Sequence, residues 1–141
     1  MIQAADGLHL FAETAGTGPE AIVIPQRIYL REYFERLANG RTVIFYDPRN
    51  RGLSETVTDA EKLSRGILHD VDDLEAIRAG YGLERISILA DSYIALAAIL
   101  YAAAFTPGEL CRKFWALLLT LYVASPGRAD DLHWEPCDFP K

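Results

Sequence analysis

Apolar runs recur along the first ninety residues at intervals that predict buried strands. The runs at 21–24 and 42–46 are nearly free of polar residues, which is typical of strands covered on both faces. A third run lies at 86–89. Near the N-terminus, a turn at Asp6-Gly7 separates two further predicted strands, 2–5 and 8–14.

Between these runs, apolar residues return at helical spacing. Leu30, Phe34 and Leu37 predict an amphipathic helix that ends at Asn39-Gly40. A longer helix is predicted from Ser64, as its N-cap, to the glycines at 80 and 82. Its apolar positions are Ile67, Val71, Leu74 and Ile77.

The last part of the chain gives less definite patterns. Residues 92–105 are apolar around the whole helical circumference, which predicts a helix buried on every side. Residues 114–124 predict a further strand, whereas 128–141 form a tail without a readable period. Both apolar segments are shorter than the roughly 20 residues that span a bilayer, so no membrane association is expected.

The alternation of strands and helices predicts an α/β fold, with a mostly parallel sheet covered by helices on both faces in three layers, α/β/α. The length of 141 residues fits a single domain over 1–141.

Composition narrows the function. The formal charge is −6, from 14 Lys and Arg against 20 Asp and Glu, and no basic block interrupts it, which argues against a nucleic-acid partner. The N-terminus has no signal-peptide pattern, and Cys111 and Cys137 stand in no metal-ligand spacing, so a cytoplasmic protein with free thiols is expected. No cofactor or metal is predicted.

The most informative polar residues follow the third predicted buried strand. Ligands of parallel α/β sheets bind at the carboxyl ends of the strands. There the chain reads Ala90-Asp91-Ser92 and enters the apolar helix directly. A serine on a sharp strand-to-helix turn, preceded by a small residue, is typical of a nucleophile elbow.

Three segments in the right order support a family resemblance. They are the loop 46–54, the helix and strand segments 70–74 and 83–88, and the pair Ser92-Tyr93. Over residues 6–101 the chain resembles α/β-hydrolase-fold proteins of the proline-iminopeptidase and epoxide-hydrolase type, and corresponds to the N-terminal half of that fold.

The resemblance implies a serine hydrolase that acts on small ester- or amide-type substrates. Ser92 would be the nucleophile, and the backbone N–H of Tyr93 would hold the oxyanion. The second oxyanion donor would be the N–H of Gln26 or Arg27, because Pro25 has none.

The sequence also departs from the family pattern. Pro25-Gln26-Arg27 stands where the family usually has His-Gly, and Ala90 and Ile94 replace the elbow's flanking glycines, with Ala95 as an alternative small contact. After Ser92 the only histidine is His133, preceded by Asp130 and Asp131 in the unpatterned tail.

These departures support a second hypothesis. In it, the chain is a truncated, inactive relative that serves as a binding or interaction module and self-associates through an exposed sheet edge.

Other polar residues have structural alternatives. Asp91 would be either an alternative nucleophile or a carboxylate at a helix N-terminus, and the latter is favoured. The loop residues Asp47, Arg49 and Arg51 would form either an anion site or local pairs, and pairing is favoured. His9 and His69 are expected to be surface or packing residues.

Overall fold

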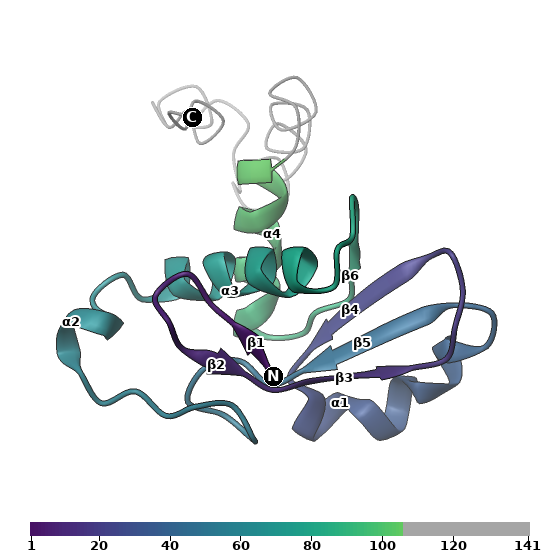
Figure 1. The fold of residues 1–141 in the computed structure, drawn as a ribbon, viewed down its shortest axis with the longest axis horizontal. Helices are drawn as coiled ribbons and strands as arrows, with labels where there is room; N and C mark the ends of the chain where they lie inside the picture. The colour runs from purple at the N-terminus through teal and green to yellow at the C-terminus, as the bar shows by residue number, and fades with distance from the viewer. Residues whose placement is uncertain (106–141) are drawn as a thin grey trace, which may run out of the picture. The chain divides into compact units, whose positions relative to one another are not determined.

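Four strands form one mixed sheet in the order β3-β5-β4-β6 (Figure 1). Strands β4 (Ala21–Pro25), β5 (Thr42–Tyr46) and β6 (Ser87–Ile88) run parallel, and β3 (Ala12–Ala15) pairs antiparallel with β5. The computed structural model of the protein describes residues 1–105, without the side chain of Lys62. The predicted, mostly parallel α/β sheet is confirmed.

One face of the sheet is covered by α1 (Arg27–Phe34) and the 3-10 helix η1 (Glu35–Ala38). Ile24, Val43 and Phe45 are fully buried there. The predicted apolar positions of this helix, Leu30, Phe34 and Leu37, all pack against that cluster. Gly40 ends the segment with φ 74°, as its place after the helix predicts.

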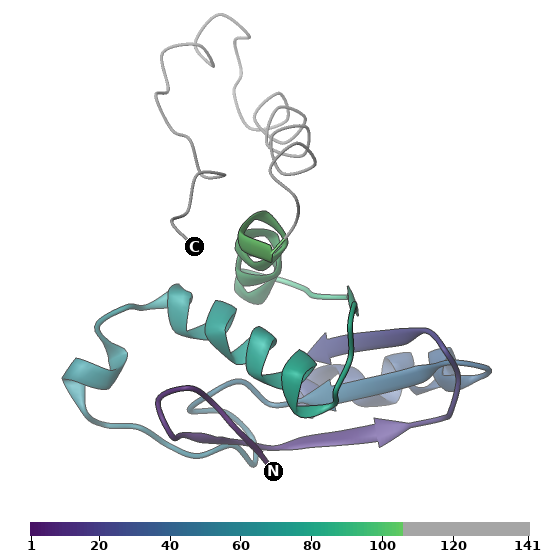
Figure 2. The same ribbon diagram turned by 45° about the horizontal axis from the view of Figure 1, so that its top comes forward.

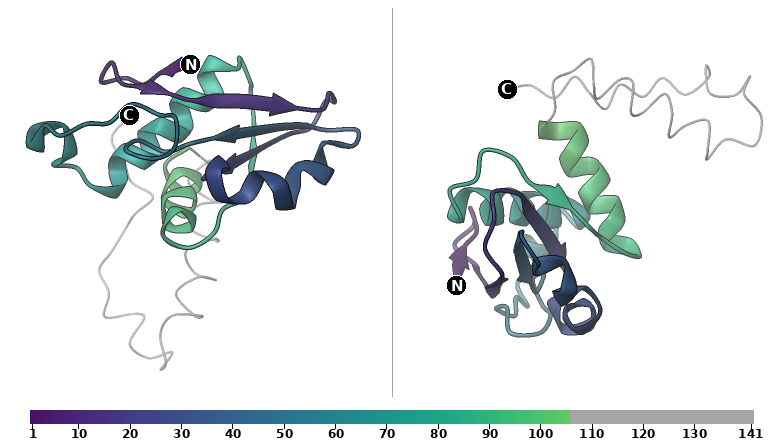
Figure 3. Two further views of the ribbon diagram at one scale, coloured as in Figure 1. Left: turned by 90° about the horizontal axis from the view of Figure 1, so that it is seen from below. Right: turned by 90° about the vertical axis from the view of Figure 1, so that its right-hand side faces the viewer.

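The opposite face is covered by α3 (Ile67–Gly80), and Figures 1 and 2 show α1 and α3 on the two sides of the sheet. Seen from below in Figure 3, α1 lies in front of the strands. Strand residues that alternate with the first cluster, such as Ile44 and Tyr46, are buried, as are Leu74 and Ile77 of α3. Helices on both faces are therefore confirmed.

The predicted strand 8–14 is wrong in one respect, because it is broken at Phe11. Its first part is β2 (His9–Leu10), which pairs with β1 (Ile2–Gln3) in a separate two-stranded sheet, and its second part is β3. At the break, the Phe11 N–H donates to Ser54 Oγ at 2.8 Å, and the Phe11 carbonyl accepts from the Asp47 N–H at 3.0 Å. These bonds to the loop after β5 take the place of strand pairing.

The predicted N-cap of the long helix is also wrong. Ser64 is the C-cap of a short helix, α2 (Ala60–Leu63), and its hydroxyl donates to the Glu61 carbonyl at 2.7 Å. The chain then turns at Gly66, which precedes α3 with φ 53° and ψ −128°. Glycine adopts that conformation readily and serine does not, so the helix begins two residues later than a serine cap would place it.

Helix α4 (Tyr93–Phe105) follows β6. Near its start Ile94 and Ala97 are fully buried, whereas Leu96 is 49% exposed, so the expectation of burial on every side is wrong there. Among the described residues, no helix is both long and apolar enough to cross a membrane.

The chain forms two compact units, Met1–Ala98 and Ile99–Lys141. In the described part of the second unit, the rings of Tyr101 and Phe105 stack with centroids 4.7 Å apart. The strand predicted at 114–124, the tail at 128–141 and both cysteines lie outside the described residues.

Candidate active site

Ser92 occupies the turn between β6 and α4 in a left-handed backbone conformation, with φ 56°. A non-glycine residue in this region costs about 1–2 kcal/mol, and such strain is concentrated at functional turns. The carbonyl of Ser92 accepts from the Ala95 N–H at 3.0 Å as the helix begins, and the serine side chain is exposed. The geometry is that of a serine presented on a sharp strand-to-helix turn.

Asp91, the alternative nucleophile, is not the left-handed residue of this turn. It is exposed and precedes the helix, in keeping with the structural role favoured from the sequence. The bulk of Ile94, which replaces an elbow glycine, is fully buried in the core.

The sheet register brings Gln26 and Ser92 to the same edge. Strands β4 and β6 are parallel neighbours, with Val23 opposite Ile88, and the Leu89 N–H donates to the Val23 carbonyl at 3.0 Å. Because the two strands end side by side, the residues that follow them share the edge where parallel sheets bind ligands.

Gln26, like Ser92, is left-handed, with φ 64° and ψ 45° at the start of α1. The side chain of Arg27 turns back to the sheet: it pairs with Glu13, approaches Asp47 at 3.6 Å and lies 4.9 Å from the Phe11 ring centre. Because its side chain is engaged there, Arg27 can offer only its backbone N–H as an oxyanion donor at this edge.

The loop after β5 is held by the buried carboxylate of Asp47. Its Oδ1 accepts from the Ile28 N–H and its Oδ2 from the Leu53 N–H, both at 3.0 Å. Gly52 lies against this carboxylate so closely that a Cβ there would stand 2.1 Å from Oδ2. Asp47 thus bonds to neighbouring backbone, as favoured from the sequence, and its two oxygens are engaged within the protein.

Arg49 in the same loop makes a buried ion pair with α3. Its Nε and Nη2 donate to the two oxygens of Asp73 at 2.8 and 2.7 Å, and its Nη1 donates to Asp6 at 2.9 Å. Burial raises the pKa of Asp73 in spite of this pairing, and the hydrogen bond to Asp73 raises the pKa of Arg49. The local pairing of Asp47 with an arginine of its own loop, favoured from the sequence, is therefore wrong: Arg49 pairs with Asp73 and Asp6, and the arginine near Asp47 is Arg27.

Tyr93, which follows the serine, is tied to the same helix. Its hydroxyl donates to Asp70 Oδ2 at 2.5 Å, and the Arg51 guanidinium lies 5.6 Å from its ring centre. Burial, followed by the bond to Asp70, raises the pKa of the Tyr93 hydroxyl, and burial raises the pKa of Asp70.

Solved structures of α/β hydrolases are similar in fold to this chain. A structure of an α/β hydrolase from Sphaerobacter thermophilus matches with a TM-score of 0.63 and 28% identity, over 75% of this chain and 40% of that one. The Bacillus megaterium epoxide hydrolase matches with a TM-score of 0.62 and 20% identity, over 73% and 37%. An esterase from Exiguobacterium antarcticum matches with a TM-score of 0.58 and 20% identity, over 72% and 38%.

The chain has a partial α/β-hydrolase fold. It spans about 40% or less of the length of these structures. No protein-family model matches the chain, and no curated protein matches its sequence.

Within this partial α/β-hydrolase fold, neither described histidine is hydrogen-bonded to Ser92, although His69 lines the same cavity as Tyr93. The exposed His9 contacts Glu55 at 3.2 Å. His69 is buried, and its Nε2 has no hydrogen-bond partner among the described residues. His133, with Asp130 and Asp131, lies outside those residues. The described part of the chain also holds no group of three or more His, Cys, Asp or Glu side chains placed to bind a metal ion.

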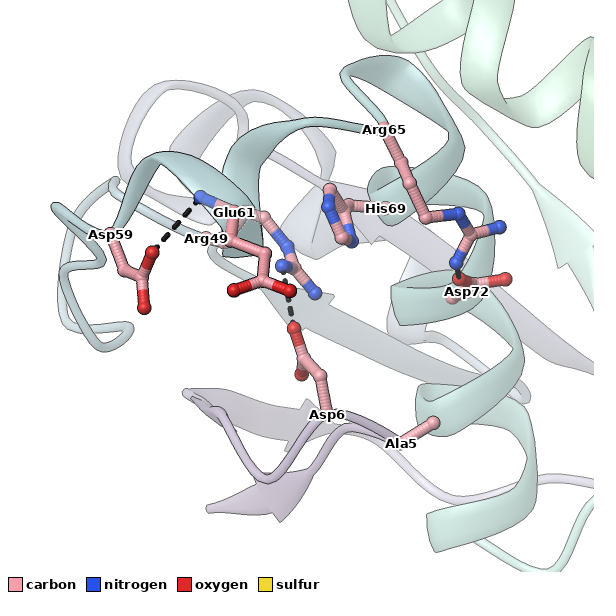
Figure 4. Close-up of a pocket in the computed structure, with 8 residues that line it drawn as sticks. All are labelled: Ala5, Asp6, Arg49, Asp59, Glu61, Arg65, His69 and Asp72. Carbon is pink, nitrogen blue, oxygen red and sulfur yellow. Dashed lines mark hydrogen bonds and ion pairs between the residues drawn. The ribbon is translucent and has the colours of Figure 1, made fainter.

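Two cavities flank the loop that carries Arg49. One of about 440 Å³ reaches the elbow, with Tyr93, Arg51 and Asp70 among its lining residues. The other, of about 510 Å³, is shown in Figure 4. Its lining residues are Ala5, Asp6, Arg49, Asp59, Glu61, Arg65, His69 and Asp72. In that cavity Arg49 pairs with Asp6 and Arg65 pairs with Asp72, so most of its charges are already satisfied within the protein.

A third cavity, of about 750 Å³, separates α1 from the segment that leads into the elbow. Leu30, Phe34, Leu89, Ala90 and Asp91 are among its lining residues, so apolar side chains form much of its wall.

Sequence reasoning missed the part that Asp70 plays at the elbow. Asp70, Asp73 and Ile77 recur at i, i+3 and i+7, and all three are buried. Two carboxylates on the apolar face of a helix need partners, and this spacing was the available signal. The partners themselves, Arg49 and Tyr93, are 24 and 23 residues away and follow only from the fold.

Proposed function

We propose that the chain carries the nucleophile and oxyanion parts of a serine hydrolase for small ester- or amide-type substrates. The observation that carries the proposal is the left-handed, exposed Ser92 on the turn between β6 and α4. A serine hydroxyl presented on such a turn can approach a carbonyl carbon without obstruction from its own strand or helix. The partial α/β-hydrolase fold supports the same assignment.

In the proposed reaction, Ser92 Oγ bonds to the substrate carbonyl carbon, its proton passes to water, and the carbonyl oxygen becomes negative. The bond to the leaving group then breaks, the alcohol or amine departs with a proton from water, and a second water molecule hydrolyses the acyl-serine. The negative oxygen would be held by the N–H of Tyr93 and by that of Gln26 or Arg27. The parallel ends of β4 and β6 support this pairing of donors. One oxyanion donor of this kind contributes about 10²–10³ to turnover.

Residues 1–105 supply no base for Ser92. No described histidine or carboxylate is hydrogen-bonded to Ser92 Oγ, so the described residues alone offer an unassisted hydroxyl, which is a weak nucleophile at neutral pH. Loss of a triad base in a serine hydrolase costs on the order of 10⁶ in turnover.

That observation favours one alternative, an inactive binding or interaction module that retains the fold. In the described sheet β6 is an edge strand, and the unpaired backbone groups of an edge strand can pair with a second copy of the chain, although the length of only two residues limits that pairing. Size-exclusion chromatography with light scattering would show a dimer or larger assembly under this alternative, and a clean monomer would contradict self-association.

Acylation by p-nitrophenyl acetate tests the enzymatic proposal. The 141-residue chain is expected to release about one equivalent of p-nitrophenolate, at the slow rate that an unassisted hydroxyl and the oxyanion donors allow, and to gain one acetyl group by intact mass. Ser92→Ala should abolish both signals. Ser87→Ala, which removes another exposed serine from β6, should leave them intact. Equal acylation of the wild type and Ser92→Ala, or none in the folded wild type, would contradict the proposal.

A further inference from the structure

The residue after the proposed nucleophile is anchored at the far end of its side chain. The Tyr93 hydroxyl donates to Asp70 Oδ2 at 2.5 Å, across 23 residues of sequence. The guanidinium of Arg51, from the loop after β5, lies 5.6 Å from the centre of the same ring. Tyr93 is therefore bound from two elements, α3 and the loop, neither of which belongs to the elbow.

Packing alone leaves the Tyr93 ring incompletely held, because 41% of the residue is exposed. The neighbouring Ser92 is exposed as well. A left-handed serine persists only where its surroundings over-determine it. The hydroxyl bond and the cation–π contact provide fixed points that the exposed surface of the ring does not.

Asp70, which accepts the bond from Tyr93, is itself held in place. It lies one helical turn before Asp73, and Asp73 accepts two hydrogen bonds from Arg49. Arg49 and Arg51 belong to the loop that Asp47 holds through the Leu53 N–H. The two contacts on Tyr93 thus come from parts of the structure that are joined to each other.

The burial of the Asp70 carboxylate is also unfavourable for stability. It is only 4% exposed, and its Oδ1 has no hydrogen-bond partner among the described residues. Burial raises the pKa of this carboxyl, which records how poorly the site solvates the charged form. A buried polar group with an unused oxygen is a poor device for stability, and such groups gather at functional sites.

We propose that Asp70 and Arg51 are positioning residues for the nucleophile elbow: by holding the side chain of Tyr93, they fix the backbone N–H that serves as oxyanion donor. This inference rests on the proposed function. Neither residue touches the reacting atoms, and both act through Tyr93. Their loss would displace the donor and the serine beside it, and displacements of about 1 Å cost up to about 100-fold in rate.

The first arm of the test is the rate at which p-nitrophenyl acetate acylates Ser92. Tyr93→Phe and Asp70→Ala are each expected to slow acylation by about 10-fold, and the double variant by no more than either alone. Asp70→Asn retains an acceptor oxygen for the tyrosine hydroxyl and should recover most of the loss seen with Asp70→Ala. Arg51→Met should slow acylation by about threefold, in line with a cation–π contact.

Two controls separate positioning from general loss of stability. Tyr81→Phe removes a hydroxyl that accepts a hydrogen bond from Thr14 at 3.3 Å, away from the elbow. Asp72→Ala removes an α3 carboxylate that pairs with Arg65 at the surface. Both should leave the acylation rate within about twofold of wild type, as expected for changes remote from the reacting groups.

The second arm is amide hydrogen exchange and needs no activity. The Ala95 N–H bonds to the Ser92 carbonyl, so its exchange reports on the elbow. Tyr93→Phe and Asp70→Ala should speed exchange over residues 95–98 by about 10-fold, whereas the two controls should not.

The two proposals fail in different ways. If the folded wild type is not acylated, the proposed function is contradicted, and exchange alone then decides the positioning role. If the wild type is acylated but Tyr93→Phe and Asp70→Ala match it in both acylation and exchange, the positioning role is overturned while the proposed function stands.

Discussion

Arg49 grips Asp73 through two hydrogen bonds, of 2.8 Å from Nε and 2.7 Å from Nη2, and both side chains are buried. The bond joins the loop after β5 to α3, two segments that the sequence separates by 24 residues. The same loop carries Arg51, and the same helix carries Asp70. The ion pair therefore joins the two elements that contact Tyr93.

Breaking one side of this pair should destabilise the fold strongly. Arg49→Met leaves the fully buried Asp73 carboxylate without its partner, and the free energy of unfolding should fall by about 3–5 kcal/mol in urea denaturation. Asp6→Asn removes only the more exposed partner of Arg49 and should cost at most about 1 kcal/mol. Equal costs for the two variants would contradict the importance of the buried pair.

The strain at Ser92 predicts an unusual order of stability. Glycine adopts a positive φ without penalty, so Ser92→Gly should unfold with about 0.5–1 kcal/mol more free energy than Ser92→Ala, which keeps the strain. At Ser87, within β6, the order should reverse, because glycine weakens a strand. If Ser92→Gly proved less stable than Ser92→Ala, the serine would not be strained in solution.

The contact between Gly52 and Asp47 predicts a steric effect beyond backbone strain. Gly52→Ala combines a positive φ of 53° with a Cβ at 2.1 Å from Asp47 Oδ2, and should cost about 2–4 kcal/mol in unfolding free energy. Gly82→Ala is the matched control, since Gly82 also has a positive φ, 64°, but faces open space. It should cost about 1–2 kcal/mol, from the backbone alone. Similar costs at both sites would show that the loop yields to the methyl group.

Asp70 should make stability depend on pH. Burial raises its folded-state pKa above the ordinary value of 3.8, so the folded protein binds the proton more tightly than the unfolded chain. The stability linked to this group is full below 3.8 and is lost as pH rises through the folded-state pKa.

Asp70→Asn has no such proton to lose, so it should gain on the wild type as pH rises and exceed it by about 1 kcal/mol near pH 7. Chemical denaturation at a series of pH values measures this difference. The surface variant Asp72→Asn should show no pH-dependent gain. A constant difference between Asp70→Asn and wild type across the series would contradict the assignment.

Much of the sheet could be predicted from the sequence because its central strands are continuous runs of apolar residues. The runs at 21–24 and 42–46 became β4 and β5 almost residue for residue, since burial on both faces leaves little choice of side chain. The break at Phe11 could not be predicted in this way. It depends on hydrogen bonds to Ser54 and Asp47, more than thirty residues away.

The site was predictable in its backbone but less so in its side chains. The place of Ser92 on a strand-to-helix turn follows from the order of apolar segments, and its left-handed φ accords with that turn. The partners of Tyr93 and Arg49 arise from tertiary packing of α3 against the loop, which no local pattern specifies. The catalytic roles of Ser92, Tyr93, Gln26 and Arg27 remain predictions.

Covalent labelling by a fluorophosphonate probe tests the central claim most directly. Purified chain would be incubated with the probe, analysed by intact mass and mapped by peptide fragmentation, with Ser92→Ala and Ser87→Ala alongside. The account predicts one adduct per chain, on Ser92, absent from Ser92→Ala and retained in Ser87→Ala. A folded wild type that takes up no probe, or an adduct that persists in Ser92→Ala, would contradict the claim that Ser92 is the nucleophile of a serine hydrolase.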